Sequence, residues 1–551
     1  MRTGVLVAAA LLLGGCSSAT KRPDGGRSGA KATEITLFFL TELRGTLEPC
    51  GCNSDPLGDI ARTAAVIASA RQERPVALFD GGSTLYLDDP IPETKRAQAE
   101  LTADAVARMY SKLEVAASGL GPYDLAAGAD KVRFARQAAN VTAGAPTTPP
   151  RIVQLGGMNI GVFGVVDPRV VAAHGVTAGD PATAAREAIA KLRGGGAELV
   201  VGLAHMTRAE ARKLAREAPG ADFLLAGREA PDEGVLAPEA VGATFIVVPG
   251  NRGQVLTRLD IDLSRGGSPL TDAVGKERAA LEIERLDEKI ARLEKDLAAW
   301  EKDPNAEAAF VARNRDQLAG LKKEREALAA QPLRKPETGG FFVARNLRIV
   351  RRLPCDAKLV AEKRGLDEAI GKANLASAEP PVAPPPGKPG YAGVEECGFC
   401  HKAAVDFWQK TRHTGAWETL EKVGKQWNRD CIGCHVTGWQ EPGGATLAKN
   451  DDLRDVQCEV CHGPASIHVD LDGKDKPRTV QRAPAADLCA SRCHTVEHSD
   501  TFAREPYLRD IVGTGHGEKL RRALGDGPTG RQLRSAALDK AGRELGANCP
   551  K

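Results

Sequence analysis

Short apolar runs alternate with helix-patterned stretches over the first half of the chain. The runs are five to seven residues long and end near glycine or polar residues, which is typical of buried strands; they cover residues 34–40, 76–80, 162–166, 199–204, 223–227 and 245–250. Between them, residues 59–72 and 181–192 place apolar side chains at helical spacing. Alternating strands and helices predict an α/β layered domain.

Residues 276–331 differ from the preceding residues in composition and in the spacing of apolar positions. They are dominated by Ala, Glu, Lys, Arg and Leu, and their apolar positions recur in steps of three and four in two arms around Asp303-Pro304-Asn305. This pattern predicts an antiparallel coiled-coil hairpin. Residues 341–353 alternate like a strand and are expected beside residues 255–263, so that the hairpin is an insertion in the sheet domain. The hairpin is either a solvent-exposed insertion without a partner or an arm that contacts a partner or a second copy.

Composition narrows the classes of partner. The 551 residues suffice for two or three domains, and a formal net charge of +3 implies neither nucleic acid nor an acidic surface as a partner. Aromatic residues make up 4% of the chain, which is tolerable where a prosthetic group supplies part of the apolar core.

The N-terminus carries an export signal. Arg2 precedes an apolar run, residues 5–13, that is too short to span a bilayer and therefore predicts a signal peptide. The ending Leu13-Gly14-Gly15-Cys16 resembles a bacterial lipoprotein cleavage box, which implies lipidation of Cys16; a plain secretory signal is the alternative. Residues 17–33 then form a flexible tether. We expect the periplasmic face of the outer membrane, with the inner membrane and the cell surface as alternatives.

Four Cys-Cys-His motifs dominate the last third of the chain. Each predicts covalent haem c, because two thiols add to the haem vinyl groups and the next histidine binds the iron. The motifs are CGFCH (Cys397, Cys400, His401), CIGCH (Cys431, Cys434, His435), CEVCH (Cys458, Cys461, His462) and a longer one, CASRCH (Cys489, Cys493, His494). In the fourth motif either the loop bulges so that both cysteines attach, or only Cys493 attaches.

The histidine count matches four haems. Eight of the ten histidines lie between residues 401 and 516: the four in the motifs, and His413, His468, His498 and His516. Four irons with two axial imidazoles each would use all eight. Structural zinc and disulfides are the alternatives, but neither requires a histidine directly after the second cysteine of every pair.

The haem region resembles the tetrahaem cytochrome c-554 family. The similarity lies in the first motif followed by Phe407, Trp408 and RHTGAW, with His413, and in GPASIH after the third motif, with His468. The resemblance implies a mostly helical fold, electron transfer, and redox proteins as donor and acceptor. In that family not every haem is six-coordinate, so the resemblance leaves the pairing of distal histidines open.

The order of strands and helices in residues 34–265 resembles 5′-nucleotidases and related calcineurin-like metallophosphatases. That resemblance implies two metals held by Asp, Asn and His side chains. Most of those positions have lost their metal ligands here, and only Asp80 and His205 keep ligand chemistry. The residues that stand in the places of the lost ligands are Glu42-Leu43-Arg44, Ser83 after Asp80, Gly121-Pro122-Tyr123-Asp124, and Gly227-Arg228-Glu229. We expect an inactive relative; an unusual site of Glu42, Asp80, Asp124 and His205 is the alternative.

The predicted domain order is a signal peptide (1–16), a tether (17–33), an α/β domain (34–275 and 333–375) with the inserted hairpin (276–331), a Pro-rich linker (376–390) and a tetrahaem domain (391–551). Cys50, Cys52, Cys355 and Cys549 are expected to form disulfides, with three pairings open. The predicted function is electron transfer by a lipid-anchored multihaem cytochrome rather than catalysis. The alternatives are an oxidoreductase acting on a small nitrogen compound, a redox-sensing or binding lipoprotein, and a weak metal-dependent phosphoesterase.

Overall fold

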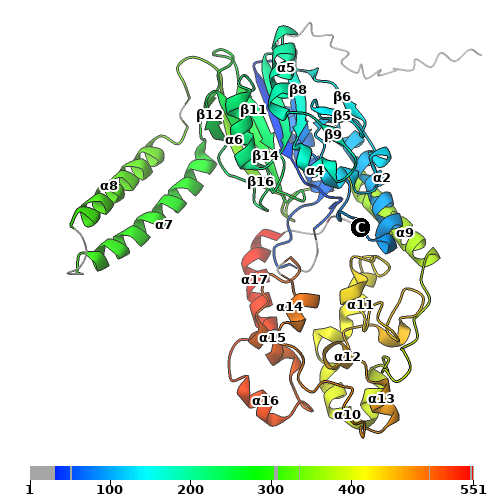
Figure 1. Ribbon diagram of the computed structural model, residues 1–551. Helices are drawn as coiled ribbons and strands as arrows, with labels where there is room; N and C mark the ends of the chain where they lie inside the picture. Colours follow the sequence, from blue (N-terminus) through cyan, green and yellow to red (C-terminus); the bar gives the residue numbers. More distant parts are fainter. Residues whose placement is uncertain are drawn as a thin grey trace, which may run out of the picture.

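The computed structural model describes residues 32–49, 53–302, 308–333, 335–495, 497–545 and Cys549. The signal peptide, Cys16, most of the tether, Cys50 and Cys52 lie outside these residues. Figure 1 shows an α/β part above a helical part, with a long two-helix hairpin projecting from the side of the α/β part. The protein is therefore multidomain, as its sequence predicts.

Two six-stranded sheets form the centre of the α/β part. The first has the order β15-β16-β14-β1-β2-β3 and contains β1 (Glu34–Leu40), β2 (Val76–Asp80), β3 (Val115–Ser118), β14 (Val255–Asp262), β15 (Thr271–Asp272) and β16 (Phe341–Arg348). The second has the order β12-β13-β11-β10-β8-β7 and contains β7 (Arg151–Leu155), β8 (Met158–Val166), β10 (Leu199–His205), β11 (Phe223–Ala226), β12 (Glu239–Val241) and β13 (Thr244–Val247). Short strands β4 (Arg136–Gln137), β5 (Val141–Ala143), β6 (Thr147–Thr148) and β9 (Thr177–Ala178) pair separately.

The core lies between the two sheets. Phe39 and Phe342 of the first sheet contact Phe223 of the second, with ring centres 6.4 and 5.2 Å apart, and the neighbouring aliphatic side chains are fully buried. Helices cover the outer faces: α1 (Ile60–Glu73), α2 (Arg96–Leu113) and α9 (Ala357–Ala376) on the first sheet, and α5 (Pro181–Gly194) and α6 (Arg208–Glu217) on the second. The arrangement confirms an α/β sandwich.

The hairpin consists of α7 (Lys276–Trp300) and α8 (Ala308–Ala330), which pack against each other and project away from the sheets (Figure 1). Strand β16 returns antiparallel beside β14, with Val255 opposite Arg348, so the hairpin leaves and re-enters the same sheet. This register is the one that an insertion in the sheet requires. That the two helices form a coiled coil stays a prediction.

The C-terminal part is helical and has a small core of its own. Its helices are α10 (Val394–Trp408), α11 (Ala416–Glu421), α12 (Cys458–His462), α13 (Ser466–Asp470), α14 (Leu488–Arg492), α15 (Arg504–Ile511), α16 (Glu518–Ala523) and α17 (Gly530–Leu545). The buried apolar cluster gathers around Trp417, Ile432 and Leu447, close to the second motif. None of the helices in the described part of the chain combines the length and apolar composition needed to cross a bilayer.

Charged side chains join the two parts along one seam. Lys425 of the helical part binds Glu48 at 2.5 Å and Asp367 at 2.8 Å, and Lys95 binds Asp430 at 2.5 Å. Burial alone would lower the pKa of Lys425, but Glu48 and Asp367 more than reverse this, so its pKa lies above the usual value. A buried pair that lost one partner would leave an uncompensated charge, so the seam resists opening.

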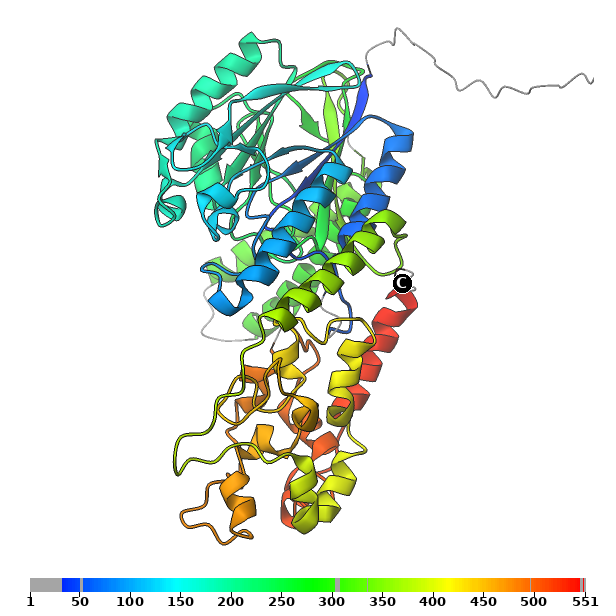
Figure 2. The same cartoon turned by 90° about the vertical axis from the view of Figure 1, so that its right-hand side faces the viewer.

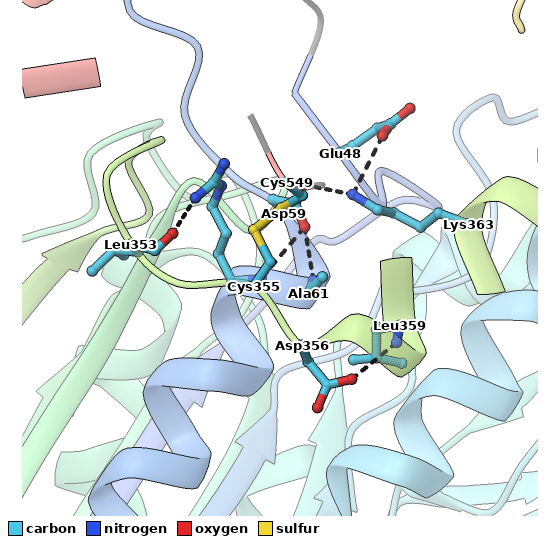
Figure 3. The surroundings of a disulfide bond; sticks show 10 residues. Glu48, Asp59, Ala61, Leu353, Cys355, Asp356, Leu359, Lys363 and Cys549 are labelled. Carbon is cyan, nitrogen blue, oxygen red and sulfur yellow. Dashed lines mark hydrogen bonds and ion pairs between the residues drawn. A yellow bond between two sulfur atoms is a disulfide. The ribbon is translucent and has the colours of Figure 1, made fainter. Parts of the chain in front are cut away.

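A disulfide between Cys355 and Cys549 closes the same seam at the end of the chain. Figure 3 shows it beside the ion pairs of Lys363 with Asp59 and Glu48. Of the expected disulfides the structure shows this one; Cys50 and Cys52 lie outside the described residues. The bond joins residues 194 positions apart, so the chain after α17 is tied back to the residue that precedes α9.

We expect Cys355→Ser to lower the denaturation midpoint, because loss of a cross-link over so long a loop costs up to about 5 kcal/mol. Thermal scans with and without dithiothreitol measure this. The wild type should respond to the reductant and the variant should not. An equal response of both proteins would show that this disulfide does not stabilise the fold.

Candidate functional site

The four motifs lie on separate short helical segments of the C-terminal part. The first is in α10, the second in a turn of 3-10 helix (Ile432–Cys434), the third forms α12, and the fourth begins in α14. Their eight cysteines are thiols rather than disulfides. A hydrogen bond with Cys458 and burial raise the pKa of Cys397, and a hydrogen bond with Cys434 and burial raise the pKa of Cys493. The first motif is therefore adjacent to the third, and the second to the fourth.

Two pairs of histidine rings face each other across the motifs. His401 and His468 have ring centres 6.5 Å apart and nearly parallel planes, at 14°. His413 and His494 have ring centres 6.5 Å apart, at 37°. A metal ion held between two imidazoles, at about 2 Å from each nitrogen, puts the ring centres about 6 Å apart. Both pairs thus have the spacing that axial ligation requires.

Hydrogen bonds to neighbouring groups determine which ring nitrogen of His435, His462 and His468 carries the proton. His435 donates from Nδ1 to the Ala416 carbonyl at 2.5 Å, and His462 donates from Nδ1 to the Gln481 carbonyl at 2.7 Å. Nδ1 of His468 lies 2.8 Å from the Asp475 carboxylate. A carbonyl oxygen only accepts, so Nδ1 carries the proton and Nε2 keeps its lone pair. This is the arrangement that orients a metal-binding histidine.

Burial keeps several of the rings neutral. It lowers the pKa of His413 to about 4, with a further contribution from His494. It also lowers the pKa values of His435, His494 and His516, the last with a contribution from His462. Neutral imidazole is the form that binds metal. His516 is thereby placed near His462, whereas His498 hydrogen-bonds Thr495 Oγ1 at 2.7 Å.

A cavity of about 1940 Å³ separates the motifs from the α/β part. The helical part contributes residues of the second and fourth motifs, Cys461 of the third, and His413 and His498 to its lining. The α/β part contributes Arg44, Tyr86, Arg252 and Arg351. Thiol pairs, neutral imidazoles and a large cavity beside them fit haem c, which would supply reversible one-electron chemistry at iron. In the described ranges no group of three or more His, Cys, Asp and Glu side chains is arranged to hold a bare metal ion.

The expected remnant of a phosphatase site lies at the ends of β2 and β10. Asp80, Asp124 and His205 are fully buried there, but a fourth buried residue, Arg136, stands among them. Its guanidinium binds Asp124 at 2.8 Å and lies 3.6 Å from Asp80, with Thr84 Oγ1 at 3.0 Å. The guanidinium supplies the positive charge that metal ions would supply between these carboxylates.

The remaining ligand candidates are also occupied. Asp124 accepts hydrogen bonds from four backbone N–H groups, those of Ser83, Thr84, Leu85 and Gly121. His205 donates from Nδ1 to the Gly81 carbonyl, so its Nε2 accepts from Ser83 Oγ at 3.1 Å. Glu42 pairs with Arg44 at 2.7 Å. This donor set does not fit two metals, and the proposed site of Glu42, Asp80, Asp124 and His205 is not assembled as a metal centre.

Sequence reasoning missed Arg136. It lies on β4, in a segment without a recognisable motif, and only the tertiary fold brings it between residues 80 and 124. The guanidinium carbon of Arg136 also lies 3.9 Å from the ring centre of Phe134, and no sequence motif predicts this contact. A buried arginine is readable from sequence only when its carboxylate partners are known.

Two parts of the chain are similar to different known proteins. Residues 396–463 match the family described as cytochrome c554 and c-prime. Over 90 residues the chain is 37% identical to cytochrome c-554 of Nitrosomonas europaea, a match that covers 13% of this chain and 38% of that protein. The chain thus spans less than two fifths of this curated relative. The C-terminal part resembles cytochrome c-554, and this resemblance implies haem c.

The N-terminal part is similar to phosphatase structures. A 5′-nucleotidase precursor from Thermus thermophilus matches at 20% identity with a TM-score of 0.36, over 42% of this chain and 52% of that one. A calcineurin-like phosphoesterase, YfkN from Bacillus subtilis, matches at 20% identity and a TM-score of 0.36, over 42% and 86%. At these TM-scores the likeness carries no conclusion about activity.

We expect Asp80→Asn to remove one component of the pH dependence of stability. Burial raises the pKa of Asp80 to about 6, despite Arg136. The protonated acid is therefore favoured in the fold, and its contribution, about 3 kcal/mol, is present below pH 4 and lost as the pH rises through 6. Denaturation temperatures between pH 4 and 7 should fall less steeply in the variant than in the wild type. Exposed Asp472→Asn is the control; parallel curves for Asp80→Asn and wild type would contradict the assignment.

Proposed function

We propose that the protein is an exported, lipid-anchored multihaem cytochrome c that carries electrons. The observation that supports this most directly is the placement of two histidine pairs at the spacing of axial ligation, each joining a motif to a histidine distant in sequence. Four haems are attached at Cys397 and Cys400, Cys431 and Cys434, Cys458 and Cys461, and Cys489 and Cys493.

The ligand pairing follows from the ring geometry. His401 pairs with His468, and His413 pairs with His494 of the fourth motif, which favours a haem at CASRCH. We assign His516 to the iron of His462 in this proposal, since burial and then the neighbouring His462 lower the pKa of His516. Ligation by two imidazoles closes the iron to small molecules and favours electron transfer over catalysis.

The thiol contacts suggest an order for electron flow. Cys397 contacts Cys458, Cys461 interacts with Cys489, and Cys493 contacts Cys434. Haems attached there would be neighbours in the order first, third, fourth, second. Electrons would enter or leave at the first motif, in the region of Phe399, whose side chain is 83% exposed, and redox proteins would be donor and acceptor.

The α/β domain acts in this proposal as a wall and support for the haem domain. Arg136 and the saturated Asp124 argue against phosphoesterase activity. The N-terminal strand β1 begins at the end of the α/β part that lies away from the haem motifs (Figure 2), so a lipid at Cys16 would leave the haem domain facing outward. The hairpin α7–α8 would contact a partner or a second copy.

A specific observation favours a second function. His435 belongs to neither of the two histidine ring pairs. Its ring hydrogen-bonds the Ala416 carbonyl and lines the interdomain cavity. Within the described residues, His498 shares that cavity but makes no comparable ring contact with it. An iron bound by His435 would then have an open position for a small ligand, as reduction of a nitrogen compound requires.

We expect His468→Ala to keep four haems, because thioether attachment does not involve this ring, and to convert one iron from low spin to high spin. Intact mass of the mature protein counts the haems, and electron paramagnetic resonance reports the spin states. His174→Ala, outside the haem domain, is the control. An unchanged spectrum would reject the His401–His468 pair, and fewer than four haems in the wild type would reject the tetrahaem assignment.

If His435 holds a five-coordinate iron, carbon monoxide should bind the reduced wild-type protein at one haem in four. Absorbance difference spectra measure this binding. Saturation by one equivalent is the expected result for the second function. Absence of any spectral change would leave only the electron carrier.

A further inference from the structure

The chain that follows α13 folds back onto the ring of His468. The N–H of Gly473 donates to the His468 carbonyl at 2.8 Å, and a Cβ on Gly473 would lie 3.3 Å from ring atom Cε1. The φ of +72° at this position also favours glycine, so the backbone can pass close to the imidazole. Two residues further on, Asp475 places Oδ1 at 2.8 Å from Nδ1 of the same ring. Direct contacts from one short segment therefore hold a predicted iron ligand.

The carboxylate of Asp475 is buried and held in one orientation. Its side chain is 1% exposed. Oδ1 faces the imidazole, and Oδ2 accepts hydrogen bonds from the backbone N–H of Thr479 at 2.6 Å and from its hydroxyl at 2.9 Å. A carboxylate ion only accepts, so Nδ1 of His468 carries the proton. Donors on both oxygens favour the ionised form, so a fixed negative charge is hydrogen-bonded to this ring.

Other predicted iron ligands contact neutral groups at Nδ1. His435 and His462 donate to backbone carbonyls, at 2.5 and 2.7 Å. Nδ1 of His494 lies 3.1 Å from the Ser499 hydroxyl. Among the histidines and carboxylates that the structure describes in the haem region, only His468 and Asp475 form an ion pair. The first haem motif, whose His401 faces His468, is thereby distinguished from the others.

A charged acceptor changes the ligand that iron would meet. A carboxylate that accepts from Nδ1 raises the basicity of the ring, and Nε2 is the nitrogen left free to bind iron. A more basic ligand and a nearby negative charge both stabilise Fe(III) relative to Fe(II), which lowers the reduction potential. A backbone carbonyl orients a ring in the same way but carries no net charge.

We propose that Asp475 is a positioning residue that lowers the reduction potential of the haem attached at Cys397 and Cys400, by accepting the hydrogen bond from Nδ1 of its distal ligand His468. This inference rests on the proposed function, since it needs that haem and the His401–His468 pair. A lower potential makes this haem a better electron donor to the other haems. It therefore favours the first motif as the point where electrons enter.

The test is a spectroelectrochemical titration of the full-length holoprotein, with Asp475→Asn beside the wild type. Asparagine keeps the shape of the side chain and one acceptor oxygen but removes the charge. One of the four redox components should move to higher potential, by roughly tenfold in the ratio of Fe(II) to Fe(III), or about 59 mV for one electron. The component that moves should belong to the iron that becomes high spin in His468→Ala.

Two matched variants separate the charge from the shape of the segment. Asp472→Asn removes a charge that is 81% exposed, three residues away, and should move no component. Thr479→Val removes one donor to Asp475 but leaves the carboxylate charge, so it should raise no potential. If the segment acted only by its fold, Thr479→Val would raise the same component as Asp475→Asn, and this result would overturn the proposal.

Electron paramagnetic resonance and intact mass complete the test. Asp475→Asn should keep four haems and remain low spin, because Nε2 of His468 still binds. A new high-spin signal in this variant would show that Asp475 is needed for ligation itself, which would overturn its role in setting the potential. Four low-spin haems with unmoved potentials would also overturn it and leave the cytochrome assignment standing. A wild type without haem at the first motif would overturn both.

Discussion

The spacing between opposed histidine rings is the constraint on which the C-terminal half depends. A ring separation of 6.5 Å recurs in two pairs whose members are 67 and 81 positions apart, His401 with His468 and His413 with His494. Such distances are not produced by local helix geometry, since each partner lies on a different segment. The small apolar cluster around Trp417 is too limited to organise these segments alone. Ligation of haem iron by these rings, as proposed above, would supply an interaction of the required strength.

The α/β half contains buried charged side chains that are balanced by one another rather than by metal ions. Two buried carboxylates would repel each other, and the buried guanidinium of Arg136 compensates them from inside the chain. Burial raises the pKa of Asp80, and the guanidinium, which lies closer to Asp124 than to Asp80, offsets this only in part. A side chain tethered to β4 cannot exchange with solvent as a metal ion does. The buried charges at the sheet ends are therefore balanced by contacts within the chain.

The strands that the sequence predicted most accurately are those whose side chains are buried on both faces of the sheet. Residues 34–40 and 76–80 coincide with β1 and β2, and the helix predicted over residues 59–72 is α1, with Asp59 as its N-cap. Strand β8 begins at Met158, four residues before the predicted run, because Asn159 and the glycines break its apolar pattern. Strand β3 was missed, since the four residues VAAS carry little strand signal. The motif residues were readable, but the ring pairing, Arg136 and the Cys355–Cys549 bond depend on tertiary contacts that no local pattern encodes.

The two halves are coupled more tightly than a Pro-rich linker suggests. Residues 376–390 are predicted to be a stiff spacer, and Lys425, Lys95 and the disulfide add direct contacts between the helical part and the α/β part. The interface encloses a cavity lined by residues of the second, third and fourth motifs. A prosthetic group that filled this space would displace water and lower the local dielectric, so each charge on the walls would act more strongly on that group. The α/β part would then act on that group by forming one wall of the cavity.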